Sequence, residues 1–105
     1  MERPGPGQVL QFANEVKEKK YWSRKPPRTS GVLDALAWAL GEQNKHPITE
    51  QPTPQFPPDM ETIAKVAEEA RAAAQNHSKL RPEYCTAVHE CLKWIDGSGL
   101  KQPRL

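Results

Sequence analysis

The sequence has no long hydrophobic run. Its longest apolar stretch, residues 32–40, is interrupted by Asp34. It is much shorter than the roughly 20 apolar residues that a membrane-spanning helix requires. The first residues, MERPGPG, contain no apolar stretch of the kind found in an export signal. We therefore expect a cytoplasmic protein with no membrane partner.

Cysteine and glycine are also scarce, with two and six residues respectively. Cys85 and Cys91 lie on what the pattern predicts to be one helix, where their side chains would project about 240° apart. That geometry disfavours a disulfide between them, and reduced thiols fit the cytoplasm. The glycines lie near the ends of the chain or of predicted helices, so there is no glycine-rich loop to bind a phosphate.

Proline, in contrast, is abundant, with 11 of the 105 residues. The length is that of one domain. Because the apolar residues, 36% of the chain, are clustered and periodic, we expect a folded centre with extended arms rather than full disorder. We assign a single helical domain to residues 1–105, with flexible ends at 1–7 and 98–105 and a proline-rich arm at 44–58.

Four segments show the helical period of 3.6 residues, and none shows a sustained period of two. The first spans 8–20, and its apolar stripe consists of Val9, Phe12, Ala13 and Val16. The second is predicted to begin at Thr29 or Ser30, whose hydroxyl groups suit an N-cap, and to end at Gly41. Apolar residues surround this helix on almost every side, so we expect it to be the central helix.

The third helix is predicted to begin after Asp59, as N-cap, and to end near Asn76. The fourth should have Pro82 in its first position, where a missing N–H costs nothing, and should end at Asp96 and Gly97. The sequence thus predicts an all-α fold, a small four-helix domain with a long proline-rich connection between helices two and three.

That connection, residues 44–58, contains five prolines, which exclude a helix or a central strand. We expect it to be extended along the surface in polyproline II geometry, with Ile48 and Phe56 packed on the core. Its PQFPP sequence at 54–58 is a candidate ligand for an aromatic groove. No basic residue lies close to the PxxP core, and the alternative is a plain connector.

The segment 17–28 holds six cationic residues and one acidic residue. The chain as a whole carries a net charge of +2, so the remainder carries −3. Basic and aromatic side chains together can bind phosphates and stack on bases. The candidate nucleic-acid-binding residues are Lys17, Lys19, Lys20, Tyr21, Arg24, Lys25 and Arg28. The simpler alternative is a solvated helix end and loop, with Trp22 packed against the core.

Catalytic or metal-binding chemistry has little support in the sequence. Cys85 and His89 lie four positions apart on one helical face, but Cys91 points away from them, and a tetrahedral zinc site needs four converging ligands. The Cys–His pair also lacks an oxyanion hole and an orienting group. We therefore predict that the protein is not an enzyme and uses no metal or cofactor, and that both thiols belong to the core.

Trp38 is the strongest candidate for a protein contact. It lies on the face of the second helix opposite Leu33, Leu36 and Leu40. If that face is open, Trp38 is an aromatic anchor of the kind that dominates interfaces; the alternative is that the proline-rich arm covers it. A homodimer through this helix also remains open.

The leading functional hypothesis is a non-enzymatic protein-interaction module whose contacts are Trp38, Trp22 and Phe56. Its size and lack of motifs suit a small accessory, regulatory or inhibitory protein, such as phages and mobile elements encode. The alternative hypothesis is a nucleic-acid-associated protein that binds through residues 17–28.

Overall fold

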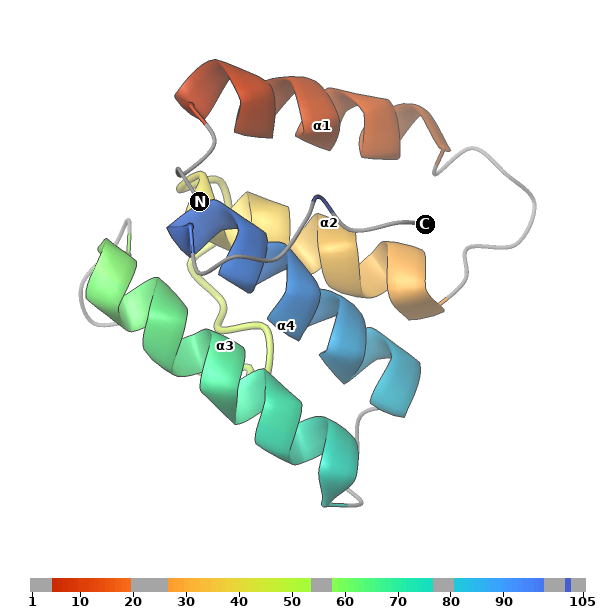
Figure 1. Ribbon diagram of the computed structural model, residues 1–105, viewed down its shortest axis with the longest axis vertical. Helices are drawn as coiled ribbons and strands as arrows, with labels where there is room; N and C mark the ends of the chain where they lie inside the picture. The colour runs from red at the N-terminus through yellow and green to blue at the C-terminus, as the bar shows by residue number, and fades with distance from the viewer. Residues whose placement is uncertain (1–4, 20–26, 54–57, 77–80, 98–101, 103–105) are drawn as a thin grey trace.

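The computed structural model describes residues 5–19, 27–53, 58–76, 81–97 and 102. Its helices are α1 (Pro6–Lys19), α2 (Pro27–Ala39), α3 (Met60–Gln75) and α4 (Pro82–Asp96) (Figure 1). Within the described residues, the strand-like pairing is limited to an isolated antiparallel bridge between Lys45 and Pro52. The predicted all-α class with four helices is confirmed, as is the long connection between α2 and α3.

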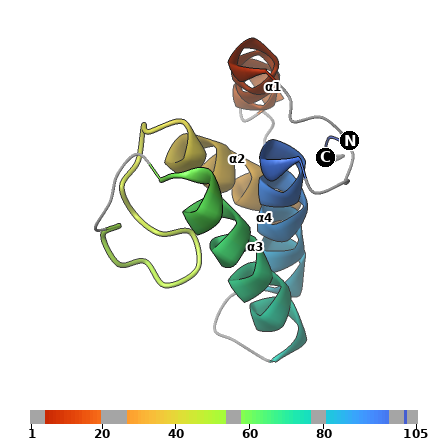
Figure 2. The ribbon, with the colours of Figure 1, turned by 60° about the vertical axis from the view of Figure 1, so that its left-hand side comes forward.

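The middle of the molecule is occupied by α4. It packs against α3 on one side and against α2 on the other, while α1 lies over α2 and away from α3 (Figures 1 and 2). Phe12 of α1 also meets Trp94 of α4 edge to face, with 5.3 Å between the ring centroids. The central position predicted for α2 therefore belongs to α4, which contacts all three other helices. The wide apolar surface of α2 correctly indicated that this helix is buried, but it did not indicate which helices pack against it.

The hydrophobic core is one cluster to which every helix contributes. Its buried members are Val9, Phe12, Ala13, Val16, Val32, Ala35, Leu36, Trp38, Ile63, Val66, Ala67, Ala70, Ala87, Val88, Cys91, Leu92 and Ile95. The stripe predicted for the first helix is thus confirmed. None of the helices in the described part of the chain combines the length and the apolar character needed to cross a bilayer.

The ends of the helices follow from local chemistry. The Asp59 side chain accepts a hydrogen bond from the backbone N–H of Thr62 at 2.8 Å, which caps α3 as predicted. Pro82 is the first residue of α4, and Gly97 ends that helix in the left-handed conformation, with φ of 79°. After α2, Gly41 has φ of 83°, so glycine is needed there too.

The beginning of α2 differs from the prediction. The helix starts at Pro27 rather than at Thr29 or Ser30, because proline is compatible with the first turn of a helix. Thr29 is consequently a buried residue inside the helix. Four residues into α2, Gly31 lies directly against α4: a Cβ atom there would be 2.5 Å from the carbonyl oxygen of Tyr84. This close approach joins the two helices, and the sequence did not predict it.

The connection between α2 and α3 is a folded loop where the structure describes it. Beyond the bridge between Lys45 and Pro52, the backbone N–H of His46 donates to the carbonyl of Gln51 at 2.9 Å. This hydrogen-bonded turn replaces the extended path expected up to residue 53. Ile48 packs against the core as predicted. The predicted polyproline ligand at 54–58 lies mostly outside the described residues.

Candidate binding groove beside the connection

Trp38 is buried beneath the loop formed by residues 44–53. Its side chain has no exposed surface, and its indole Nε1–H donates to the hydroxyl oxygen of Thr53 at 2.7 Å. The Thr53 hydroxyl in turn donates to the carbonyl oxygen of Asn44 at 3.0 Å. The open face that would make Trp38 an anchor is therefore absent from this structure. Of the two interpretations of Trp38, the structure shows the covered one, because the indole N–H finds its acceptor in the loop.

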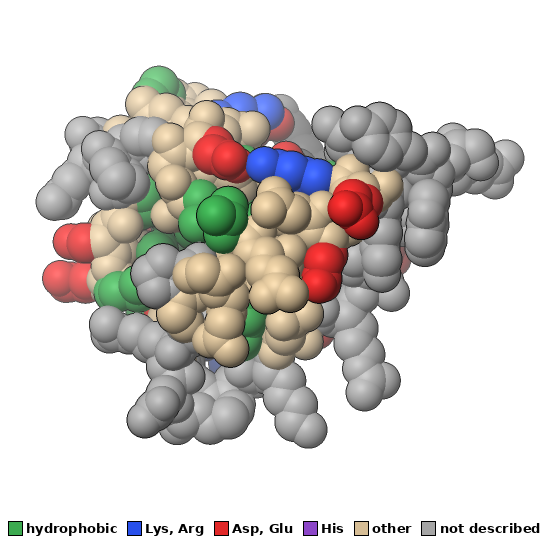
Figure 3. Space-filling view, turned by 90° about the horizontal axis from the view of Figure 1, so that it is seen from above, with side chains coloured by type: hydrophobic (Ala, Val, Ile, Leu, Met, Phe, Trp, Pro, Cys, Tyr) green, Lys and Arg blue, Asp and Glu red, His purple; other side chains and the backbone are tan. Residues whose placement is uncertain are grey.

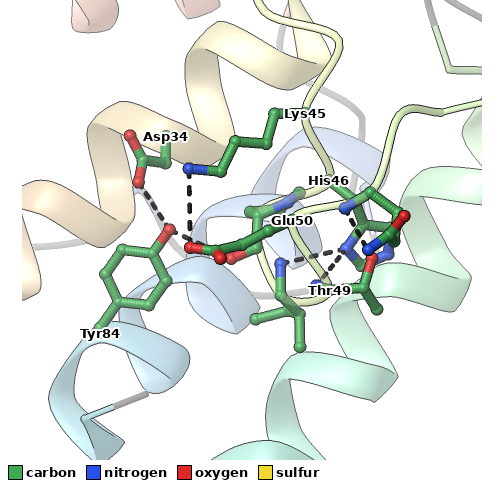
Figure 4. Close-up of polar contacts among 9 residues, drawn as sticks. Asp34, Lys45, His46, Thr49, Glu50 and Tyr84 are labelled. Carbon is green, nitrogen blue, oxygen red and sulfur yellow. Dashed lines mark hydrogen bonds and ion pairs between the residues drawn. The ribbon is translucent and has the colours of Figure 1, made fainter. Parts of the chain in front are cut away.

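His46 connects this loop to α3, and its ring packs beside the ring of Trp38. Its Nδ1 atom accepts hydrogen bonds from the backbone N–H groups of Ile48 and Thr49, at 3.0 and 3.1 Å (Figure 4). Its Nε2 atom lies 3.3 Å from a carboxylate oxygen of Glu69, and its ring centroid lies 5.8 Å from that of Trp38. Burial lowers the pKa of His46, although the Glu69 carboxylate acts in the opposite direction.

Tyr84 of α4 holds the same loop from another side. Its hydroxyl oxygen lies 2.6 Å from a carboxylate oxygen of Asp34 and 3.1 Å from the carbonyl oxygen of Pro47 (Figure 4). The Tyr84 hydroxyl has one proton, and it donates this proton to the nearer and charged acceptor, the Asp34 carboxylate. Burial and the Asp34 carboxylate both raise the pKa of Tyr84, so the phenol is neutral near pH 7. The loop is thus fixed by side chains from α2, α3 and α4.

A groove of about 330 Å³ lies between this loop and α3. Its lining residues are His46, Thr49, Gln51, Pro52, Thr53, Thr62, Lys65, Val66 and Glu69. Val66 is buried, whereas Lys65 and Glu69 are exposed one helical turn apart on α3. We call this feature the loop–α3 groove. An apolar residue at its base and charged residues on its rim are the usual features of a binding site for a side chain.

The basic segment 17–28 is only partly described. Lys17 forms an ion pair with Glu42 at 3.2 Å, and Arg28 forms one with Glu90. Lys19 ends α1, but its side chain lies outside the described part, as do residues 20–26, which include Lys20, Tyr21, Trp22, Arg24 and Lys25. The two described side chains of the predicted nucleic-acid site are therefore both engaged with carboxylates.

Acidic residues outnumber basic ones in the part of the chain that the structure describes. It contains 12 Asp and Glu residues against eight Lys and Arg residues, a formal charge of −4, which leaves +6 for the remaining residues. Seen from the side of α1, the described cationic side chains lie among acidic ones rather than in a continuous patch (Figure 3).

The residues considered for metal or thiol chemistry all lie on α4. Cys85 and Cys91 are both buried and form no disulfide, and burial raises the pKa of Cys91. Nδ1 of His89 lies 2.8 Å from the carbonyl oxygen of Ala67. Among the described residues, no three His, Cys, Asp or Glu side chains come together as metal ligands would.

His46, Thr53 and Glu69 were not among the predicted site residues, although they define the groove and its support. The chain holds only a general signal at His46, because the residue before a proline is biased away from the helical conformation and His46 precedes Pro47. No local signal pairs Thr53 with Trp38 or His46 with Glu69, because these contacts join distant positions. Phe56, the third predicted contact, lies outside the described residues.

The geometry of the groove is thus the main guide to function. Comparison with family models, with curated proteins and with solved structures finds no match for this chain.

Proposed function

We infer that this protein is a non-enzymatic, cytoplasmic protein-interaction module, and that the loop–α3 groove holds a segment of a partner protein. The observation that carries this proposal is a hollow with a buried apolar base at Val66 and a polar rim, beside a loop fixed by three helices. A site held in its binding conformation loses little freedom when a partner arrives. Binding by occupancy requires no catalytic group.

The chemistry of the groove indicates which partner it fits. Val66 and Pro52 offer apolar contact, and a volume of about 330 Å³ accommodates a side chain with its neighbouring backbone rather than a whole helix. On the rim of the groove, the exposed Glu69 carboxylate can pair with a cationic side chain of the partner. The proposed occupant is an extended segment with an apolar residue flanked by Lys or Arg.

Trp38 takes a supporting role in this proposal. Its indole N–H holds Thr53, which lines the groove, and its ring lies beside that of His46. A partner that touched Trp38 directly would first have to displace the 44–53 loop. Trp22 and Phe56 stay as predicted contacts, because both lie outside the described residues.

A peptide selection with matched variants tests the proposal. The full-length protein is used to select binders from a random peptide library, and the affinity of a selected peptide is then measured by titration. Gln51→Trp fills the groove from an exposed lining position, whereas Gln75→Trp adds the same side chain at an exposed end of α3 outside the groove. We expect Gln51→Trp to weaken binding about tenfold or more and Gln75→Trp to leave it nearly unchanged.

The same experiment can overturn the proposal. Selected peptides should contain an apolar residue next to Lys or Arg, and their binding should shift the NMR signals of Thr62, Lys65 and Val66. Acidic peptides, equal losses in both variants, or shifts confined to another face would contradict it. A concentration series by light scattering identifies the case in which the occupant is a second copy of the chain.

The nucleic-acid alternative stays a prediction because charge is segregated along the chain. The segment 17–28 holds six cationic residues and one acidic residue in a chain whose net charge is +2. This alternative predicts binding of short DNA or RNA at about 50 mM salt that weakens steeply as salt is added. Absence of binding at that salt concentration would exclude it without affecting the groove.

A further inference from the structure

The arrangement around His46 depends on one protonation state of its ring. Two backbone N–H groups, those of Ile48 and Thr49, donate to Nδ1, so this nitrogen must carry a lone pair. The ring proton therefore resides on Nε2, which faces the carboxylate of Glu69 at 3.3 Å. His46 thus closes the turn at 46–49 through one nitrogen and attaches the loop to α3 through the other.

Protonation of Nδ1 converts the acceptor that closes this turn into a donor. The N–H groups of Ile48 and Thr49 would then point at another N–H, and both hydrogen bonds would be lost. Because Ile48 is half-buried, its N–H would be left with poor access to water. The imidazolium and the closed turn are therefore incompatible.

The charged and titratable groups around His46 determine when the ring is protonated. On α3, Glu69 favours the charged ring, and Lys65 lines the same groove. In the loop, Lys45 and Glu50 are paired with each other at 3.6 Å and largely offset one another. On α4, Tyr84 is neutral near pH 7, and it engages Asp34 of α2. Burial prevails over Glu69, so the pKa of His46 lies below its usual value.

We propose that His46 is a pH-sensitive switch whose protonation opens the turn at 46–49, while Nε2 stays against the Glu69 carboxylate of α3. This device concerns the turn itself and does not depend on what occupies the groove. A ring with a lowered pKa takes up its proton more readily when the turn is open. The closed turn is therefore fully favoured above about pH 6.5 and loses that advantage as the pH falls toward the lowered pKa of His46.

NMR on the full-length protein can follow each part of the switch between about pH 7.5 and about pH 5. The ring signals of His46 give its titration midpoint, which we expect below 6.5. With the same midpoint, the amide protons of Ile48 and Thr49 should lose protection from exchange and the indole N–H signal of Trp38 should move.

Two substitutions separate the switch from a merely structural role. In His46→Asn, the side-chain oxygen can accept from the N–H two residues further along but does not titrate, so the turn should stay closed across the whole range. In Glu69→Gln, the group that favours the charged ring is gone, so the midpoint should move to lower pH. The proposal is overturned if protection of Ile48 and Thr49 persists while His46 titrates, or if His46→Asn opens at the same midpoint.

Discussion

The contact between α2 and α4 and the contact between the 44–53 loop and α3 are held by different physics. The first is close packing, in which the backbone of Gly31 lies directly against that of Tyr84. The second is a polar contact between His46 and Glu69 beside a hollow, and the loop itself is held by hydrogen bonds within it and to Trp38. Close packing is sensitive to volume and indifferent to pH, whereas the polar contact responds to protonation and leaves room for a partner.

The largest effect is expected from adding one methyl group at the close contact between α2 and α4. In Gly31→Ala, the new Cβ would lie 2.5 Å from the Tyr84 carbonyl oxygen and 3.0 Å from the Cβ of Ala87. Because the carbonyl belongs to a helix backbone that cannot move aside, we expect unfolding free energy to fall by about 3 kcal/mol. Urea unfolding followed by circular dichroism measures the loss.

Gly7→Ala is the matched control, since nothing lies within 4 Å of a Cβ at this position in α1. It should be neutral or slightly stabilising, because alanine favours the helix. Equal midpoints of urea unfolding for the two variants would show that the helices are not in close contact at Gly31.

A smaller effect is expected from removing one hydrogen bond under the loop. Thr53→Val keeps the shape of the side chain but leaves the Trp38 indole N–H buried without its acceptor. We expect a loss of about 1 to 2 kcal/mol in unfolding free energy. Thr49→Val, at an exposed position of the same loop, should cost less than about 0.5 kcal/mol. The opposite order in urea unfolding would place the support of the loop elsewhere.

The smallest effect is expected at the exposed edge of the loop. Lys45 and Glu50 form an ion pair at 3.6 Å, but both side chains are more than half exposed. Solvent screening makes such pairs weak, so Lys45→Ala should change the unfolding free energy by less than about 0.5 kcal/mol. A loss as large as that of Thr53→Val would mean that charge, rather than buried hydrogen bonding, holds the loop.

The same contrast explains what could be predicted from the sequence. The helices were predictable because their apolar residues recur every three or four positions and their ends carry local signals, such as Asp59, Pro82 and Gly97. The groove was not, because its support joins residues that no period connects. Trp38 bonds to Thr53, and His46 meets Glu69 only once the chain has folded.

Trp38 shows where a periodic pattern stops being informative. The pattern located it on the face away from the leucine stripe, but it could not say whether that face met solvent or the connection. The answer depends on the indole N–H, which needs an acceptor when it is buried and finds one in the hydroxyl of Thr53. Gly31 poses the same problem, because the partner backbone that requires it belongs to Tyr84, far along the chain.

The thiol of Cys91 gives the protein an internal reporter of core opening. It is fully buried in α4, and burial raises its pKa, so the reactive thiolate forms only when the helix leaves the core. The rate at which Cys91 is alkylated would report opening of the whole fold, whereas the rate of amide exchange at Ile48 would report opening of the loop alone. The ratio of the two rates therefore measures how often the loop opens while the helical core stays closed.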